Sequence, residues 1–139
     1  MKYFSTKKIS TPEGDMMPVF KDWEHPDYDP KMVYVTTMLP NTVKGPILHK
    51  ERKYFVTAIT GTVDIEVLVN GVVCTYNLHD EERPQEYSTL ILEENIPVRF
   101  VSRGSSIGTI VNCPSKAWHP NNPDTIKYVS WDDLIKSNI

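Results

Sequence analysis

The side chains best suited to chemistry lie in segment 49–55, which reads His-Lys-Glu-Arg-Lys-Tyr-Phe. An imidazole has an ordinary pKa of about 6.5, so His49 can accept a proton near neutral pH. Tyr54 adds a hydroxyl that can donate a proton, and Arg52 adds a charge that suits a phosphate group. We therefore expect His49, Arg52 and Tyr54 to lie at a ligand-binding end of the fold, with Arg52 binding substrate, whereas Lys50 is expected to point to solvent.

A second group of polar side chains follows the dipeptide Ile96-Pro97. Arg99 and Arg103 are spaced so that both lie on the same face of an extended strand, where guanidinium groups could bind a diphosphate. Ser102 offers a hydroxyl that could polarise a substrate oxygen. We expect Arg99, Ser102 and Arg103 to bind substrate, and the alternative for the two arginines is a solvated face.

The third candidate group is the aromatic pair Trp118-His119. Trp118 and Trp131 can be core residues or platforms on which a base stacks, and the core is the preferred interpretation. His119 is a candidate pocket residue, so Trp118 and His119 complete the expected substrate-binding set. His25 and His79 lie in loops rich in proline or acidic residues and are expected at the surface.

Short strands separated by turns must position these side chains. Runs of β-branched and aromatic residues predict strands over 32–38, 54–59, 63–69, 89–92, 96–101 and 107–111. Asn70-Gly71 accepts the positive φ angles of a type I′ turn and predicts a hairpin. Asp64 and Glu66 alternate with apolar residues, which assigns them to a wet face and not to a catalytic pair.

The two ends of the chain differ from this middle part. Segment 1–29 is rich in Pro, Asp, Glu and Met and predicts an arm before the core, with a loop over 24–30. Segment 79–85 is expected to be a polar loop. Ser130, followed by acidic residues and a late lysine, predicts a short helix over 130–136.

The composition of the 139-residue chain limits its class. Eleven prolines, six glycines and seven tyrosines favour an all-β fold, and the length suits a single domain. A net charge of −3 without a basic run gives no reason to expect nucleic acid or a membrane surface as partner. Cys74 and Cys113 are far apart and are expected to be buried thiols. The polar N-terminus has no signal-like apolar stretch, which favours a cytoplasmic location.

Several motifs together resemble one known family. They are His49-Lys50 with Phe55 and Gly61, the run Gly61-x-Val63-Asp64-Ile65, Ile96-Pro97, and Trp118-x-Pro120-x-x-Pro123-Asp124 before Trp131-Asp132-Asp133. With these motifs, segment 32–133 resembles the sugar-nucleotide cupins, which include dTDP-4-dehydrorhamnose 3,5-epimerase and the dTDP-4-keto-6-deoxyhexose 3,4-ketoisomerases. The resemblance implies one cupin-type jelly-roll β-barrel domain over 1–139, with an arm (1–30), a barrel (31–129) and a terminal helix (130–139).

The resemblance also implies a site without metal or other cofactor. A metal-binding cupin has four ligands, whereas the corresponding positions here are Ile47, His49, Tyr54 and Ser102, of which only the imidazole is a usual ligand. One imidazole cannot supply the three protein donors that a catalytic divalent metal usually needs. The sugar-nucleotide members of the family are themselves metal-free.

In the epimerases the histidine that matches His49 removes the proton next to the 4-keto group, and a tyrosine across the pocket returns one. At the position of that tyrosine this chain has Ala117. The resemblance therefore implies that His49 is the catalytic base, and the proton donor is expected among Tyr54, Tyr34, Tyr87 and His119. Of these, Tyr54 is the expected catalytic residue beside His49.

Two functions remain open from the sequence. The first is a sugar-nucleotide isomerase or epimerase that acts next to the ketone of a nucleotide-linked 4-keto-6-deoxy sugar. The second is a non-catalytic cupin that binds a sugar nucleotide, a glycan or a protein partner. Relatives form dimers, and segment 16–20 is an apolar stretch without a local partner, so a homodimer is expected.

Overall fold

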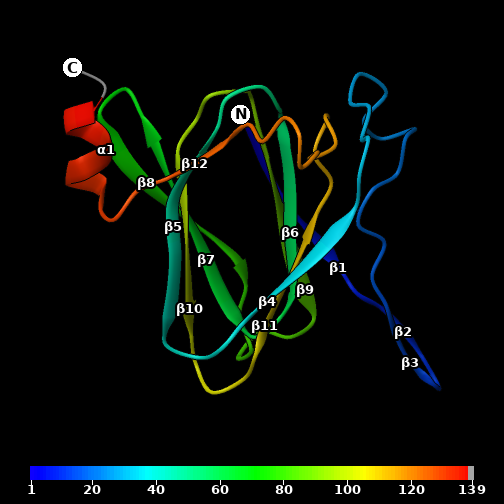
Figure 1. The fold of residues 1–139 in the computed structure, drawn as a ribbon. Coiled ribbons are helices and arrows are strands. Elements are labelled where there is room, and N and C mark those ends of the chain that lie inside the picture. Colours follow the sequence, from blue (N-terminus) through cyan, green and yellow to red (C-terminus); the bar gives the residue numbers. More distant parts are fainter. Residues whose placement is uncertain (138–139) are drawn as a thin grey trace.

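The computed structural model describes residues 1–137, whose strands form two five-stranded antiparallel sheets packed face to face (Figure 1). The first sheet has the spatial order β1 (Lys2–Lys7), β9 (Glu86–Leu92), β6 (Tyr54–Thr60), β11 (Gly108–Asn112) and β4 (Tyr34–Met38). The second has the order β12 (Thr125–Lys127), β5 (Thr42–His49), β10 (Val98–Arg103), β7 (Thr62–Val69) and β8 (Val72–His79). This two-sheet architecture confirms the expected all-β jelly roll.

The main hydrophobic core lies between the two sheets and follows the period of the strands. On β10, Val98, Phe100 and Ser102 are buried while Arg99 and Arg103 face outward. The same alternation buries apolar side chains of β6, β7 and β11 against one another. Burial of each large apolar side chain contributes roughly 1.5–3 kcal/mol, so this layer holds the two sheets together.

The tight hairpin between β7 and β8 is confirmed. Asn70 and Gly71 both have positive φ, 51° and 77°, and Val69 pairs with Val72 across the turn. This is the geometry of a two-residue type I′ turn, which an Asn-Gly pair adopts with little strain.

The N-terminal segment differs from the expected arm. β1 pairs with β9 along its whole length, and β2 (Ile9–Thr11) and β3 (Gly14–Met16) form a small separate hairpin. The next stretch folds back over the outer face of the first sheet, where Phe20, His25 and Tyr28 pack around Phe55. The apolar part of the segment thus has a partner within its own chain, and the first strand is β1 and not the one over 32–38.

Two histidines that were expected at the surface are partly or fully buried. His25 stacks on Phe4 with ring centroids 5.3 Å apart, and burial lowers its pKa. His79 ends β8, and its Nδ1 lies 2.5 Å from the carbonyl oxygen of Gly61. Both expectations were wrong, because the loop that carries His25 folds against the first sheet and His79 belongs to strand β8 and not to a loop.

The C-terminal helix α1 (Trp131–Ser137) begins where the sequence predicts it. Ser130 caps it, since its hydroxyl accepts a hydrogen bond from the Asp133 amide at 3.1 Å. Leu134 is the helix residue that is buried against the barrel. The last two residues of the expected terminal helix, 138–139, lie outside the described residues. No helix within 1–137 is long and apolar enough to cross a membrane.

Candidate active site

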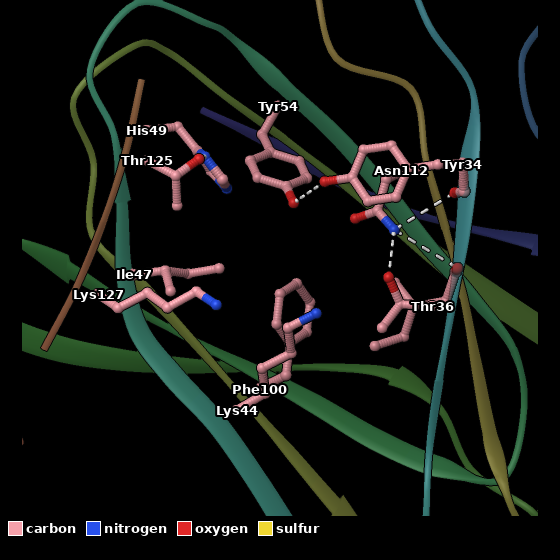
Figure 2. Close-up of a pocket in the computed structure, with 11 residues that line it drawn as sticks. Tyr34, Thr36, Lys44, Ile47, His49, Tyr54, Phe100, Asn112, Thr125 and Lys127 are labelled. Atoms are coloured by element: carbon pink, nitrogen blue, oxygen red, sulfur yellow. Dashed lines mark hydrogen bonds between the residues drawn. The ribbon is translucent and has the colours of Figure 1, made fainter. Parts of the chain in front are cut away.

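A cavity of about 120 Å³ lies between the two sheets, and inward-facing side chains of six strands line it (Figure 2). The titratable groups of its wall are one histidine, His49, two tyrosines, Tyr34 and Tyr54, and two lysines, Lys44 and Lys127. The complete lining is Tyr34, Thr36, Lys44, Ile47, His49, Tyr54, Phe100, Ile110, Asn112, Thr125 and Lys127. Residues that are far apart in the sequence meet here because the strands that carry them face one another across the barrel.

His49 stands at the end of β5, and β12 holds its ring. Only 6% of the residue is exposed, and Nδ1 lies 3.0 Å from the hydroxyl oxygen of Thr125, its partner in the strand register. Nε2 is buried and has no hydrogen-bond partner among the described residues. When Nδ1–H donates to Thr125, Nε2 carries the lone pair, so this nitrogen is free to accept a proton from a ligand in the cavity.

The electrostatics keep His49 neutral. Burial is the largest cause that lowers its pKa to about 4, and the charge of Arg52 lowers the pKa further while Asp124 opposes it. A neutral imidazole at physiological pH is the form that can act as a general base.

Two tyrosines lie beside this histidine. The rings of His49 and Tyr54 are 4.7 Å apart, and the hydroxyl oxygens of Tyr54 and Tyr34 are 2.7 Å apart (Figure 2). Burial raises the pKa of Tyr34, and burial together with Tyr34 raises the pKa of Tyr54 well above its usual value. Both phenols therefore stay protonated and can donate a hydrogen bond or a proton. Of the four expected donors, Tyr87 instead donates to the Pro18 carbonyl at 2.5 Å.

A wider hollow of about 350 Å³ adjoins the cavity, and Tyr34, His49 and Thr125 line both. Its remaining walls are Met32, Arg52 and Trp118. Trp118 is 46% exposed, which corrects its interpretation as a core residue. An exposed indole on the wall of a hollow offers a flat apolar surface to a ligand.

Arg52 lies on the wall of the hollow, but its charge is already paired. Its guanidinium donates through Nε to Asp124 Oδ2 at 2.9 Å and through a second nitrogen to the other carboxylate oxygen. Both side chains are almost fully buried, at 2% and 3% exposed. Burial alone raises the pKa of Asp124, but the hydrogen bonds and charge of Arg52 outweigh it and hold the pKa below its usual value. The pair therefore presents no net charge to a ligand.

The remaining expected substrate-binding residues lie outside both hollows. Arg99 and Arg103 share the outer face of β10, as expected, where they form ion pairs with Glu66 and Asp64. Ser102 points into the core, and its buried hydroxyl has no partner among the described residues. His119 is exposed, and its Nδ1 accepts a hydrogen bond from the Asn121 amide at 3.1 Å.

The structure adds cavity residues that the sequence did not indicate. Lys44 and Lys127 come from β5 and β12, and Asn112 comes from β11, where its amide lies 3.4 Å from the Thr36 hydroxyl. The strand that carries Lys44 is interrupted by Gly45-Pro46, which hides its alternation. Within 1–137, no group of three His, Cys, Asp or Glu side chains could hold a metal ion. Of the two cysteines, Cys113 is buried as expected, whereas Cys74 is half-buried.

No protein-family model and no curated protein matches this sequence. Solved structures do match its fold. A dTDP sugar isomerase from Desulfovibrio desulfuricans G20 superposes with a TM-score of 0.74 at 13% identity, covering 91% of this chain and 83% of that one. A His-to-Asn mutant of the 3,4-ketoisomerase QdtA from Thermoanaerobacterium thermosaccharolyticum gives 0.70 at 18% identity, covering 97% and 92%.

A third match is ChmJ, a 3′-monoepimerase from Streptomyces bikiniensis, with a TM-score of 0.71 at 15% identity over 90% of this chain and 68% of that one. The chain therefore has the jelly-roll fold of dTDP-sugar isomerases and epimerases. At the level of fold, this confirms the resemblance given by the sequence.

Proposed function

We propose that the protein is a metal-free isomerase or epimerase of a nucleotide-linked 4-keto-6-deoxy sugar. One observation carries the proposal: the buried Nε2 of His49 lies without a partner on the wall of a cavity, next to two protonated tyrosines. A buried polar atom without a partner is costly in a merely structural role, whereas a base that waits for its substrate needs such an atom. The similarity of fold to QdtA, whose mutant holds TDP-4-keto-6-deoxyglucose, supports the choice of substrate.

The proposed reaction begins with proton abstraction next to the ketone. Nε2 of His49 takes the proton, the C–H electron pair forms the double bond of an enolate, and the carbonyl oxygen gains the negative charge. The hydroxyl of Tyr54 donates a hydrogen bond to that oxygen or a proton to the enolate carbon. The hydroxyl of Tyr34 then donates a hydrogen bond to the oxygen of Tyr54 and stabilises its partial negative charge. If Tyr54 only donates a hydrogen bond, the imidazolium, which is disfavoured in this buried position, returns its proton to the sugar. If Tyr54 protonates the carbon, the proton held by His49 instead restores the phenol of Tyr54.

Deuterium exchange tests this step directly. The protein is incubated with dTDP-4-keto-6-deoxyglucose in deuterium oxide, and deuterium at the carbons beside the ketone is measured by NMR and mass spectrometry. We expect incorporation by the wild-type chain and a loss of at least about 100-fold in His49→Asn, because general-base catalysis typically contributes that much. The matched control is His119→Asn, an exposed histidine outside both hollows.

The same experiment separates the enzyme from a binding protein. Saturable binding of the sugar nucleotide without deuterium incorporation would contradict the enzymatic proposal and favour the non-catalytic cupin. Equal exchange by wild type and His49→Asn would exclude His49 as the base.

A further inference from the structure

The two lysines of the cavity, Lys44 and Lys127, form no ion pair with any described residue, unlike the arginines around the site. Arg52, Arg99 and Arg103 each form an ion pair with a carboxylate. Among the ion pairs within residues 1–137, none involves Lys44 or Lys127. The positive charge available to a ligand is therefore concentrated on these two ammonium groups.

Their position defines one end of the cavity. Figure 2 shows both amino groups pointing into the cavity, with that of Lys44 across from the hydroxyl of Tyr54. Lys127 follows Thr125 by two residues on β12 and pairs with Ile47, so it lies on the same side as Thr125 but farther from the hollow that contains Trp118. Lys44 and Lys127 are exposed residues, which places this end at an opening to solvent.

The electrostatics of this end favour an anion. Burial of its ammonium lowers the pKa of Lys44, and the charge of Lys127 lowers it further. Two like charges held near each other repel, and an anion placed between them relieves this repulsion. At the opposite end, the Arg52–Asp124 pair is neutral and Trp118 offers an apolar surface, so that end has no comparable attraction for phosphate.

We propose that Lys44 and Lys127 bind the diphosphate of a nucleoside diphosphate ligand at the solvent-facing end of the cavity. This assignment replaces the arginines expected from the sequence, and it rests on the proposed function for its choice of ligand. It also fixes the direction of the ligand: the sugar extends from the lysines toward His49, and its far end, which carries the 6-deoxy carbon, lies toward the apolar hollow beside Trp118.

Calorimetric titration of the full chain with dTDP and with thymidine tests the assignment. We expect Lys44→Met and Lys127→Met each to weaken dTDP binding at least about tenfold, the loss typical of one hydrogen bond to a charged group. Thymidine, which lacks the diphosphate, should bind all variants alike, and the loss should shrink at high salt. Lys50→Met is the matched control, because this exposed lysine neighbours His49 but lines neither hollow.

The outcomes separate this assignment from the proposed function. Wild-type affinity for dTDP in both lysine variants would overturn the assignment even if deuterium exchange proceeds, and so would a wild-type chain that does not bind dTDP. Lysine-dependent dTDP binding without deuterium exchange would support the assignment and contradict the enzymatic proposal. Lys44→Gln provides a second variant, and a thermal melt checks that each variant is folded.

Discussion

We infer that the hydroxyl pair of Tyr34 and Tyr54 replaces the proton-donating tyrosine that the epimerases have at the position of Ala117. The two oxygens share a hydrogen bond of 2.7 Å, and only Tyr54 also packs against the ring of His49. We therefore expect Tyr54→Phe to lower the rate of deuterium exchange about 100-fold and Tyr34→Phe to lower it less, because Tyr34 acts through Tyr54. Tyr76→Phe, on the far strand β8, is the control. An exchange rate of Tyr54→Phe within twofold of wild type would exclude this donor.

The pH dependence of exchange should reflect the buried state of His49. Protonated His49 cannot accept a further proton, so kcat/KM falls as the pH drops through the pKa of His49 in the free enzyme. Burial places that pKa at about 4, well below the ordinary 6.5. We expect kcat/KM to stay level between pH 8 and pH 6 and to fall only toward about pH 4. If kcat/KM instead falls near pH 6.5, the His49 imidazole is exposed to water and its pKa is not lowered by burial.

Individual side chains show what the sequence could and could not predict. His49 and Tyr54 line the cavity, and the sequence could single them out because their chemistry and neighbouring motif are local in the chain. Their catalytic role stays a prediction. Arg99 was placed on the correct face of its strand, but its carboxylate partner is 33 residues away and no local pattern reveals it. Lys44 was missed for a similar reason, since its place on the cavity wall depends on strands that meet only in the fold.

At the scale of elements, the buried Arg52–Asp124 pair connects the segment after β5 to the start of β12. The pair joins residues that are 72 positions apart in the sequence, and its Arg52 lines the same hollow as His49. Arg52→Met leaves the Asp124 carboxylate buried without its partner, so we expect the free energy of unfolding to fall by about 3–5 kcal/mol. Denaturant unfolding followed by tryptophan fluorescence measures this change.

Two further variants serve as comparisons for the stability of Arg52→Met. Arg103→Met removes a partly exposed ion pair on β10 and should cost no more than about 1 kcal/mol. The double variant Arg52→Met with Asp124→Leu removes both charges and should recover much of the lost stability. If Arg52→Met costs no more than Arg103→Met, the pair does not hold these elements together.

The elements also show where strand prediction succeeds. The β7–β8 hairpin was predictable because alternation and the Asn-Gly turn are both local signals. β1 was not, because its mostly exposed, polar sequence becomes a strand only by pairing with β9, about 80 residues later. β5 was missed because Gly45-Pro46 interrupts its pattern.

At the scale of the whole molecule, the expected homodimer needs a surface other than segment 16–20. Val19 and Phe20 of that segment pack on the cluster around Phe55 and Cys113 within the same chain. A different apolar surface remains at the free edge of the first sheet, where Val33 and Val35 are 65% and 59% exposed beside and on β4. Free strand edges with apolar side chains tend to associate with another chain.

We therefore expect the protein to form a dimer that covers the β4 edge. Light scattering coupled to size-exclusion chromatography at micromolar concentration should give twice the chain mass of 16.0 kDa. Val35→Lys should shift the mass toward the monomer, because an ammonium group in an apolar contact loses its hydration without gaining a partner. Val72→Lys, at the β7–β8 hairpin, is an equally exposed control and should remain dimeric. A wild-type monomer would contradict the dimer, and a Val35→Lys dimer would place its interface away from β4.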